Sequence, residues 1–271
     1  MYHKIGFLLT AELTNIKSLY KSSCELKKRL FVEHIDDIIR KHYKRRALLD
    51  LTYESADTKS VLLLYNILTM LQNNTESSYF PFDVYKLKKW DVEHIASRKD
   101  SNSVPSPNRE GWLKDVRSYI DCKEPEGPGL VERIDKMLDR KTYENNDEFA
   151  VLFNEVTEHF NKNMNSGEDL DEISNLALLD ARTNRGYKNA VFPLKRKYII
   201  DLDKTGGFVP ICTKNAFLKY FSDYPPKLSF WTEDDRLKYE EDLGRVLGNY
   251  MEVEELSLIH ISEPTRQEAI S

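Results

Sequence analysis

Helical periodicity is the feature that most limits how this chain can fold. Over residues 24–46 the apolar residues recur at spacings of mostly three and four, which places them on one stripe with charge on the opposite face. The run from Val61 to Leu71 is more apolar, but it is shorter than the ~20 residues that a membrane-spanning helix needs. We therefore expect it to be a buried core helix. Further helices are predicted at 110–120, 129–140, 147–164, 213–221 and 232–250.

Local signals locate two helix starts. Thr232 precedes three acidic residues, and a threonine N-cap with an acidic first turn is typical of a helix N-terminus. Pro193 falls inside the helical segment 184–201. Because proline breaks or kinks a helix interior, we expect the regular helix to begin near Phe192.

Strand character is confined to two short segments. Apolar and polar residues alternate around Trp90, Val92 and His94, and residues 173–179 form a short apolar run. With helices predicted elsewhere, the fold class indicated is mainly α with a small α+β core.

Composition narrows the function classes. The chain of 271 residues has 40 Lys and Arg against 45 Asp and Glu, a net charge of −5. This balance argues against a protein that coats its whole surface with nucleic acid but allows a local basic patch. The three cysteines show no CxxC spacing, so neither a disulfide framework nor a zinc site is indicated. We expect a cytoplasmic protein without a membrane anchor.

Three short motifs follow one another along the chain. They are the acid–histidine pair Glu93-His94, Asn175 at the start of the second apolar run, and Asn184 in Asn-Arg-Gly, nine residues later. Taken singly, each is more often a structural or turn feature. Taken together, they resemble the ββα-metal (HNH, His-Me finger) nuclease core. The 81 positions between His94 and Asn175 require a helical insertion.

The amino-acid sequence around these motifs extends the resemblance. The segments WDVEHIASR, ISNLALLDARTNRGYKNAVFPLKRKYI and GGFVPICTKNAFLKYFS resemble the C-terminal nuclease half of GmrSD-like modification-dependent restriction endonucleases, and YHKIGFLL, LTYESADTKSVLLLYNIL and SSYFPFDVYKLKKW resemble the helical region that precedes it. The resemblance implies a prokaryotic anti-phage DNA endonuclease that acts on modified DNA. It also implies an N-terminal nucleotide-hydrolysing domain that this sequence lacks, so that a nucleotide would act only through that missing domain. Many relatives carry a glutamine shortly after the histidine, where this chain has Ala96-Ser97-Arg98.

The resemblance also implies residue roles. His94 would be the general base, since a neutral imidazole can take a proton from water near pH 7. Glu93 and Asn184 would supply oxygen ligands to Mg²⁺ or Mn²⁺, and Asn175 would hold the histidine-bearing loop through hydrogen bonds.

A basic segment follows the last motif. Residues 182–200 contain six basic residues and no acidic one, which suits contact with a phosphate backbone. Arg185, Lys188 and Lys195 are the predicted phosphate contacts. The alternative is an ordinary solvated helix face.

The expected organisation has four parts. Residues 1–80 form a helical region, 81–205 a nuclease core with an insertion at about 98–171, and 206–255 a helical extension. Residues 256–271 resemble a translated sequencing adapter and are expected to be non-native. Two alternatives stay open, a non-catalytic DNA-binding or protein-interaction fragment and an RNA nuclease.

Overall fold

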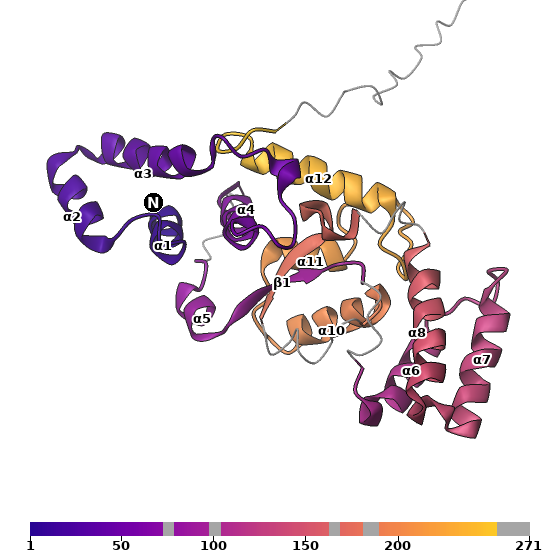
Figure 1. Ribbon diagram of the computed structural model, residues 1–271. Helices are drawn as coiled ribbons and strands as arrows, with labels where there is room; N and C mark the ends of the chain where they lie inside the picture. Colours follow the sequence, from indigo (N-terminus) through magenta and orange to yellow (C-terminus); the bar gives the residue numbers. More distant parts are fainter. Residues whose placement is uncertain (73–78, 98–103, 163–168, 181–189, 254–271) are drawn as a thin grey trace, which may run out of the picture.

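The computed structural model describes residues 1–72, 79–97, 104–162, 169–180 and 190–253. Helices make up most of this part of the chain (Figure 1). They are α1 (Tyr2–Thr10), α2 (Ile16–Glu25), α3 (Lys28–Tyr43), α4 (Thr58–Gln72), α5 (Phe82–Leu87), α6 (Arg109–Arg117), α7 (Gly127–Arg140), α8 (Asn146–Asn161), α10 (Phe192–Lys204), α11 (Ile211–Phe217) and α12 (Glu233–Leu247), with short 3₁₀ turns η1 (Leu48–Asp50), η3 (Ser106–Asn108), η4 (Thr142–Glu144), η5 (Asp169–Asp171) and η6 (Ile173–Asn175).

The sheet consists of two antiparallel strands, β1 (Trp90–His94) and β2 (Leu176–Asp180). Trp90 lies opposite Asp180, and His94 lies opposite Leu176. The prediction of a mainly helical protein with a small sheet is confirmed. The second strand begins later than expected, because η6 occupies the first three residues of the predicted strand.

Most of the helix predicted over residues 24–46 is present as α3, but its predicted start is wrong. The side chain of Asn15 caps α2 by accepting a hydrogen bond from the Ser18 amide, and α2 ends at Glu25. Leu26 is extended, with φ −107° and ψ 141°, so the chain turns before α3. This break allows α2 to pack against α3, an arrangement that the spacing of apolar residues alone does not reveal.

Helix α4 occupies the centre of the main core. Residues 61–67 are all buried, as expected for a helix that is apolar on every side. It packs against α1, α11, α12 and both strands. The predicted core helix is therefore confirmed, and no helix among the described residues is long and apolar enough to cross a membrane.

Both predicted helix starts are confirmed. Helix α10 begins at Phe192 with Pro193 in its first turn, where the missing proline amide costs no hydrogen bond. Thr232 caps α12 and forms a capping box with Asp235. The carboxylate of Asp235 also pairs with the buried ammonium group of Lys219.

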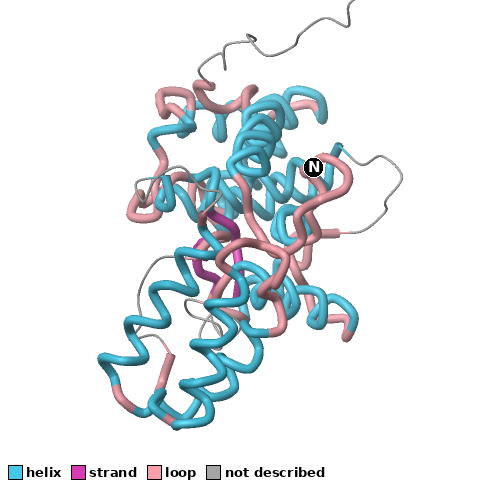
Figure 2. Tube along the Cα trace, turned by 90° about the vertical axis from the view of Figure 1, so that its right-hand side faces the viewer, coloured by secondary structure: helices cyan, strands magenta, loops and turns pink. Residues whose placement is uncertain are grey.

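The chain between the two strands builds a second core. Helices α6, α7 and α8 lie beside one another in Figure 2 and bury their own apolar residues, separately from the main core. We call residues 104–161 the insertion. Helix α10 packs on both cores, since Phe192 and Ile199 belong to the main core and Leu194 belongs to the core of the insertion. The chain between the two strands thus forms a small helical unit, and α10 connects this unit to the strand pair.

Candidate active site

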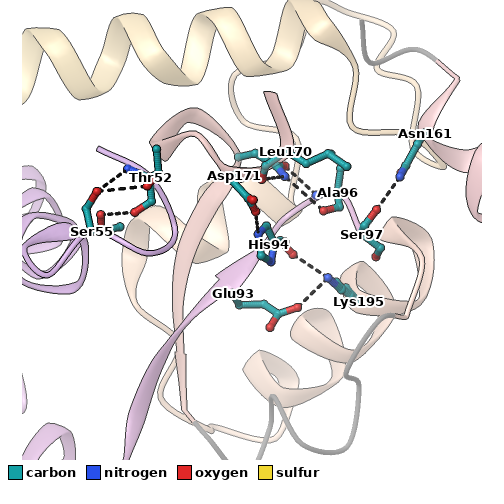
Figure 3. A network of polar contacts seen from close by, with 12 residues as sticks. Thr52, Ser55, Glu93, His94, Ala96, Ser97, Asn161, Leu170, Asp171 and Lys195 are labelled. Atoms are coloured by element: carbon teal, nitrogen blue, oxygen red, sulfur yellow. Dashed lines mark hydrogen bonds and ion pairs between the residues drawn. The ribbon is translucent and has the colours of Figure 1, made fainter. Parts of the chain in front are cut away.

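His94 is the last residue of β1. Asp171 holds one edge of its ring (Figure 3), and Tyr53 covers one face. The ring atom Nε2 lies 2.8 Å from Oδ1 of Asp171. The Tyr53 ring stacks on the imidazole with centroids 4.5 Å apart and planes 23° apart. The His94 side chain is 12% exposed, so it is reachable from solvent but largely enclosed.

The electrostatic surroundings favour the neutral form of His94. Burial is the largest influence and lowers the pKa of the ring, and the nearby Lys195 ammonium group lowers it further. The hydrogen bond with Asp171 raises the pKa, but the net pKa lies below the ordinary value of 6.5. Near pH 7 the imidazole is therefore mostly neutral and able to accept a proton.

Asn175 fixes the backbone that follows His94. Its side chain is fully buried. Its Oδ1 accepts a hydrogen bond from the Ala96 amide at 2.8 Å, and its Nδ2 donates to the carbonyl oxygens of Ala96 at 3.2 Å and Leu170 at 2.8 Å. The Ile95 amide also donates to the Asn175 carbonyl at 2.8 Å. These hydrogen bonds hold the backbone that leaves His94 against the start of β2.

The segment after Ala96 is fixed to two other elements. The hydroxyl of Ser97 donates to the carbonyl of Ala190, just before α10. The Nδ2 of Asn161, at the end of α8, donates to the Ser97 carbonyl at 2.6 Å. The loop that leaves His94 is therefore connected both to α10 and to the insertion.

Lys195 lies in the interior, beside the end of β1. Its Nζ is 2.6 Å from Oε1 of Glu93 and donates to the carbonyl of His94 at 2.6 Å. The residue is 4% exposed, so the ammonium group predicted to contact phosphate has little access to solvent. In this structure it binds the end of β1 through Glu93 and the His94 carbonyl.

Of the two predicted metal ligands, Glu93 and Asn184, only Glu93 is among the described residues. Oε1 of Glu93 forms the ion pair with Nζ of Lys195. Within the described ranges there is no group of three or more His, Cys, Asp or Glu side chains that could hold a metal ion. Asn184, Arg185 and Lys188 lie outside the described residues. The carboxylate of Glu93 could supply one oxygen ligand to a divalent cation, which would need further ligands from elsewhere.

Two residues beside His94 were missed by sequence reasoning. Tyr53 comes from the turn before α4 and Asp171 from η5, and the Tyr53 amide donates to the Asp171 carbonyl at 2.7 Å. A bridge between Thr52 and Glu172 adds to this contact. Neither segment carries a local signal, because an aspartate in a polar stretch and a tyrosine in a turn are ordinary residues there.

Comparison of the chain with protein-family models, curated proteins and solved structures found no match.

Proposed function

We propose that this chain is a metal-dependent DNA endonuclease with His94 as its general base. The observation that carries the proposal is the arrangement of β1, β2 and Asn175. A neutral, partly accessible imidazole stands at the end of one strand, and a buried asparagine at the start of the other strand holds the following backbone. A ββα-metal nuclease would require these two features in this order.

The chemistry follows from the residues. His94 would take a proton from a water molecule whose oxygen attacks the phosphorus of a phosphodiester. The bond from phosphorus to the leaving ester oxygen breaks, and that oxygen receives a proton from solvent. Mg²⁺ or Mn²⁺, held by Glu93 and Asn184, would supply charge neutralisation at the phosphate and at the leaving oxygen. Lys195 holds Glu93 and the His94 carbonyl in register with each other.

The substrate proposal comes from the sequence motifs. Double-stranded DNA carrying modified bases, as in phage genomes, is the substrate class that they favour, and Arg185 and Lys188 are the proposed phosphate contacts. The basic segment of residues 182–200 supports a polyanionic substrate even though the chain as a whole is acidic.

Plasmid cleavage tests the proposal. The full chain is incubated with plain or base-modified DNA in Mg²⁺ or in EDTA, as wild type and as His94→Ala. We expect nicking that requires Mg²⁺ and falls by about 10²- to 10⁴-fold in His94→Ala, the range typical for loss of a general base.

His42→Ala is the matched control. His42 lies on α3 with its side chain 38% exposed, away from the strand pair, so its loss should leave cleavage unchanged. Equal cleavage by His94→Ala and wild type would rule out His94 as the base. Cleavage of labelled RNA alone would favour an RNA nuclease, and EDTA-resistant, salt-sensitive binding without cleavage would favour a binding module.

A further inference from the structure

The carboxylate of Asp171 defines the chemistry of the His94 ring. The two groups meet at 2.8 Å between Oδ1 and Nε2, although 77 positions separate them in the chain. An ionised carboxylate can only accept hydrogen bonds. The neutral ring must therefore carry its proton on Nε2 in order to make this bond, and Nδ1 is left with a lone pair.

The other ring nitrogen has no competing protein partner in the described part of the chain. The contacts of the His94 side chain there are the Asp171 hydrogen bond at Nε2 and the Tyr53 stack on the ring face. Nδ1 is thus the ring atom left to accept a proton from outside the protein.

Asp171 itself is held by backbone contacts on both sides. Its carbonyl accepts a hydrogen bond from the Tyr53 amide at 2.7 Å, and the amide of Ile173 donates to the carbonyl of Leu51 at 3.0 Å. Just before it, the Leu170 carbonyl accepts from Asn175 Nδ2. The carboxylate is therefore presented to the ring by a segment that is already fixed, as an orienting group requires.

We propose that Asp171 is a positioning residue that holds His94 as the Nε2–H tautomer and makes Nδ1 the proton-accepting atom. The catalytic role of Asp171 rests on the proposed function. The hydrogen bond between Asp171 and His94, and the tautomer that it selects, can be tested without measuring cleavage. Asp171 acts through His94 and has no contact with the reacting atoms in this scheme. Tyr53 adds to the effect by holding the plane of the ring.

Nitrogen NMR of the full chain, with ¹⁵N-labelled histidine rings, reports the tautomer directly. His94 signals are assigned by their loss in His94→Gln, and spectra are recorded at a pH where the ring is neutral. The proposal requires a protonated Nε2 and an unprotonated Nδ1 in wild type. In Asp171→Ala we expect a mixture of both tautomers, and in Asp171→Glu a return toward the Nε2–H form.

Glu172→Gln is the matched control on the same segment. Glu172 pairs with Arg236 at 2.8 Å and lies next to Asp171, so this change disturbs the segment but leaves the partner of His94 in place. We expect it to keep the wild-type tautomer. If Asp171→Ala fails to fold, as judged by circular dichroism, the near-isosteric Asp171→Asn takes its place, because its amide can donate to the ring and should shift protons toward Nδ1.

Kinetics then separates the two proposals. If the wild type cleaves DNA, Asp171→Ala should lower kcat and leave KM nearly unchanged. The fall in kcat should be smaller than the 10²- to 10⁴-fold loss that is typical when the general base itself is removed. A wild-type ring protonated at Nδ1, or an unchanged tautomer in Asp171→Ala, overturns the assignment of Asp171 whatever the activity. A wild type that cleaves nothing while its spectra show the expected tautomers overturns the nuclease proposal and upholds the hydrogen bond.

Discussion

The Asn175 side chain binds both backbone groups of Ala96. Its Oδ1 accepts from the Ala96 amide at 2.8 Å, and its Nδ2 donates to the Ala96 carbonyl at 3.2 Å. One buried side chain thus closes a loop of about 80 residues at its two ends, next to the candidate base. This relationship makes Asn175 the first residue to alter.

Asn175→Ala should destabilise the protein and remove cleavage. The change leaves the Ala96 amide and the Leu170 carbonyl without their partner in a buried position, at a cost of about 1–3 kcal/mol for each group left unsatisfied. Urea unfolding measures the loss. Asn66→Ala is the control, because Asn66 is also buried and bonds the Leu62 carbonyl and the Cys212 amide. A similar loss of stability with cleavage retained is expected for Asn66→Ala.

The Glu93–Lys195 pair should be strongly coupled. Glu93 is 9% exposed and Lys195 is 4% exposed, so Lys195→Met leaves a buried carboxylate without its partner, at a cost of about 3–5 kcal/mol. The double variant Glu93→Gln/Lys195→Met should be more stable than Lys195→Met alone. A cycle on Lys21 and Glu25, an exposed pair at 3.9 Å, should show a much smaller coupling. Additive losses at Glu93 and Lys195 would contradict this account.

His159 should make stability fall at low pH. Burial lowers the pKa of this ring, with a further lowering from Lys162 that outweighs the opposite effect of Glu124 at 3.7 Å. Neither ring nitrogen has a hydrogen-bond partner among the described residues. Below its ordinary value of 6.5, the unfolded chain binds a proton that the folded chain resists. The free energy of unfolding therefore falls as pH drops through 6.5, by at most about 1.4 kcal/mol per pH unit for one histidine.

His159→Phe should flatten this dependence. Phenylalanine keeps a ring beside Phe160 and Phe230, which the histidine ring already contacts. Urea unfolding at pH 7.5, 6.5 and 5.5 compares the two proteins. Parallel curves for wild type and His159→Phe would show that His159 contributes nothing to the pH dependence.

Tyr53 should affect cleavage through its stack on His94. Tyr53→Leu removes the aromatic face, whose interaction is worth about 0.5–1.5 kcal/mol in typical aromatic pairs, so a fall in rate of roughly 2- to 10-fold is expected. Tyr53→Phe keeps the ring and should keep more of the rate than Tyr53→Leu. The measurement is the cleavage rate under saturating DNA, and equal losses in both variants would contradict a role for the stack.

Local rules in the sequence account for much of the fold. The start of α10 at Phe192 and the cap of α12 at Thr232 follow from the geometry of proline and threonine. The break between α2 and α3 was not predictable from spacing, because the apolar stripe continues across Leu26. The reason for that break is tertiary, since it brings two helices together.

The residues of the candidate site also differ in whether the sequence alone indicates them. Glu93, His94 and Asn175 could be identified because their order and spacing form a pattern. Asp171 and Tyr53 could not, because they reach His94 through a bridge between Thr52 and Glu172 that joins distant segments. The sequence indicates Lys195 by its position in a basic segment, but its burial depends on how α10 packs in the folded protein.

Helix α10 gives the site a mechanical property. Neighbouring side chains of this one helix are embedded in different cores, with Phe192 in the main core and Leu194 in the core of the insertion. Lys195, the next residue of α10, donates a hydrogen bond from its ammonium group to the carbonyl of His94. A tilt of the insertion that rotates α10 must therefore pull on the strand end through that ammonium group. The distance between Glu93 and His94 is therefore coupled to the orientation of α6, α7 and α8, which lie outside the sheet.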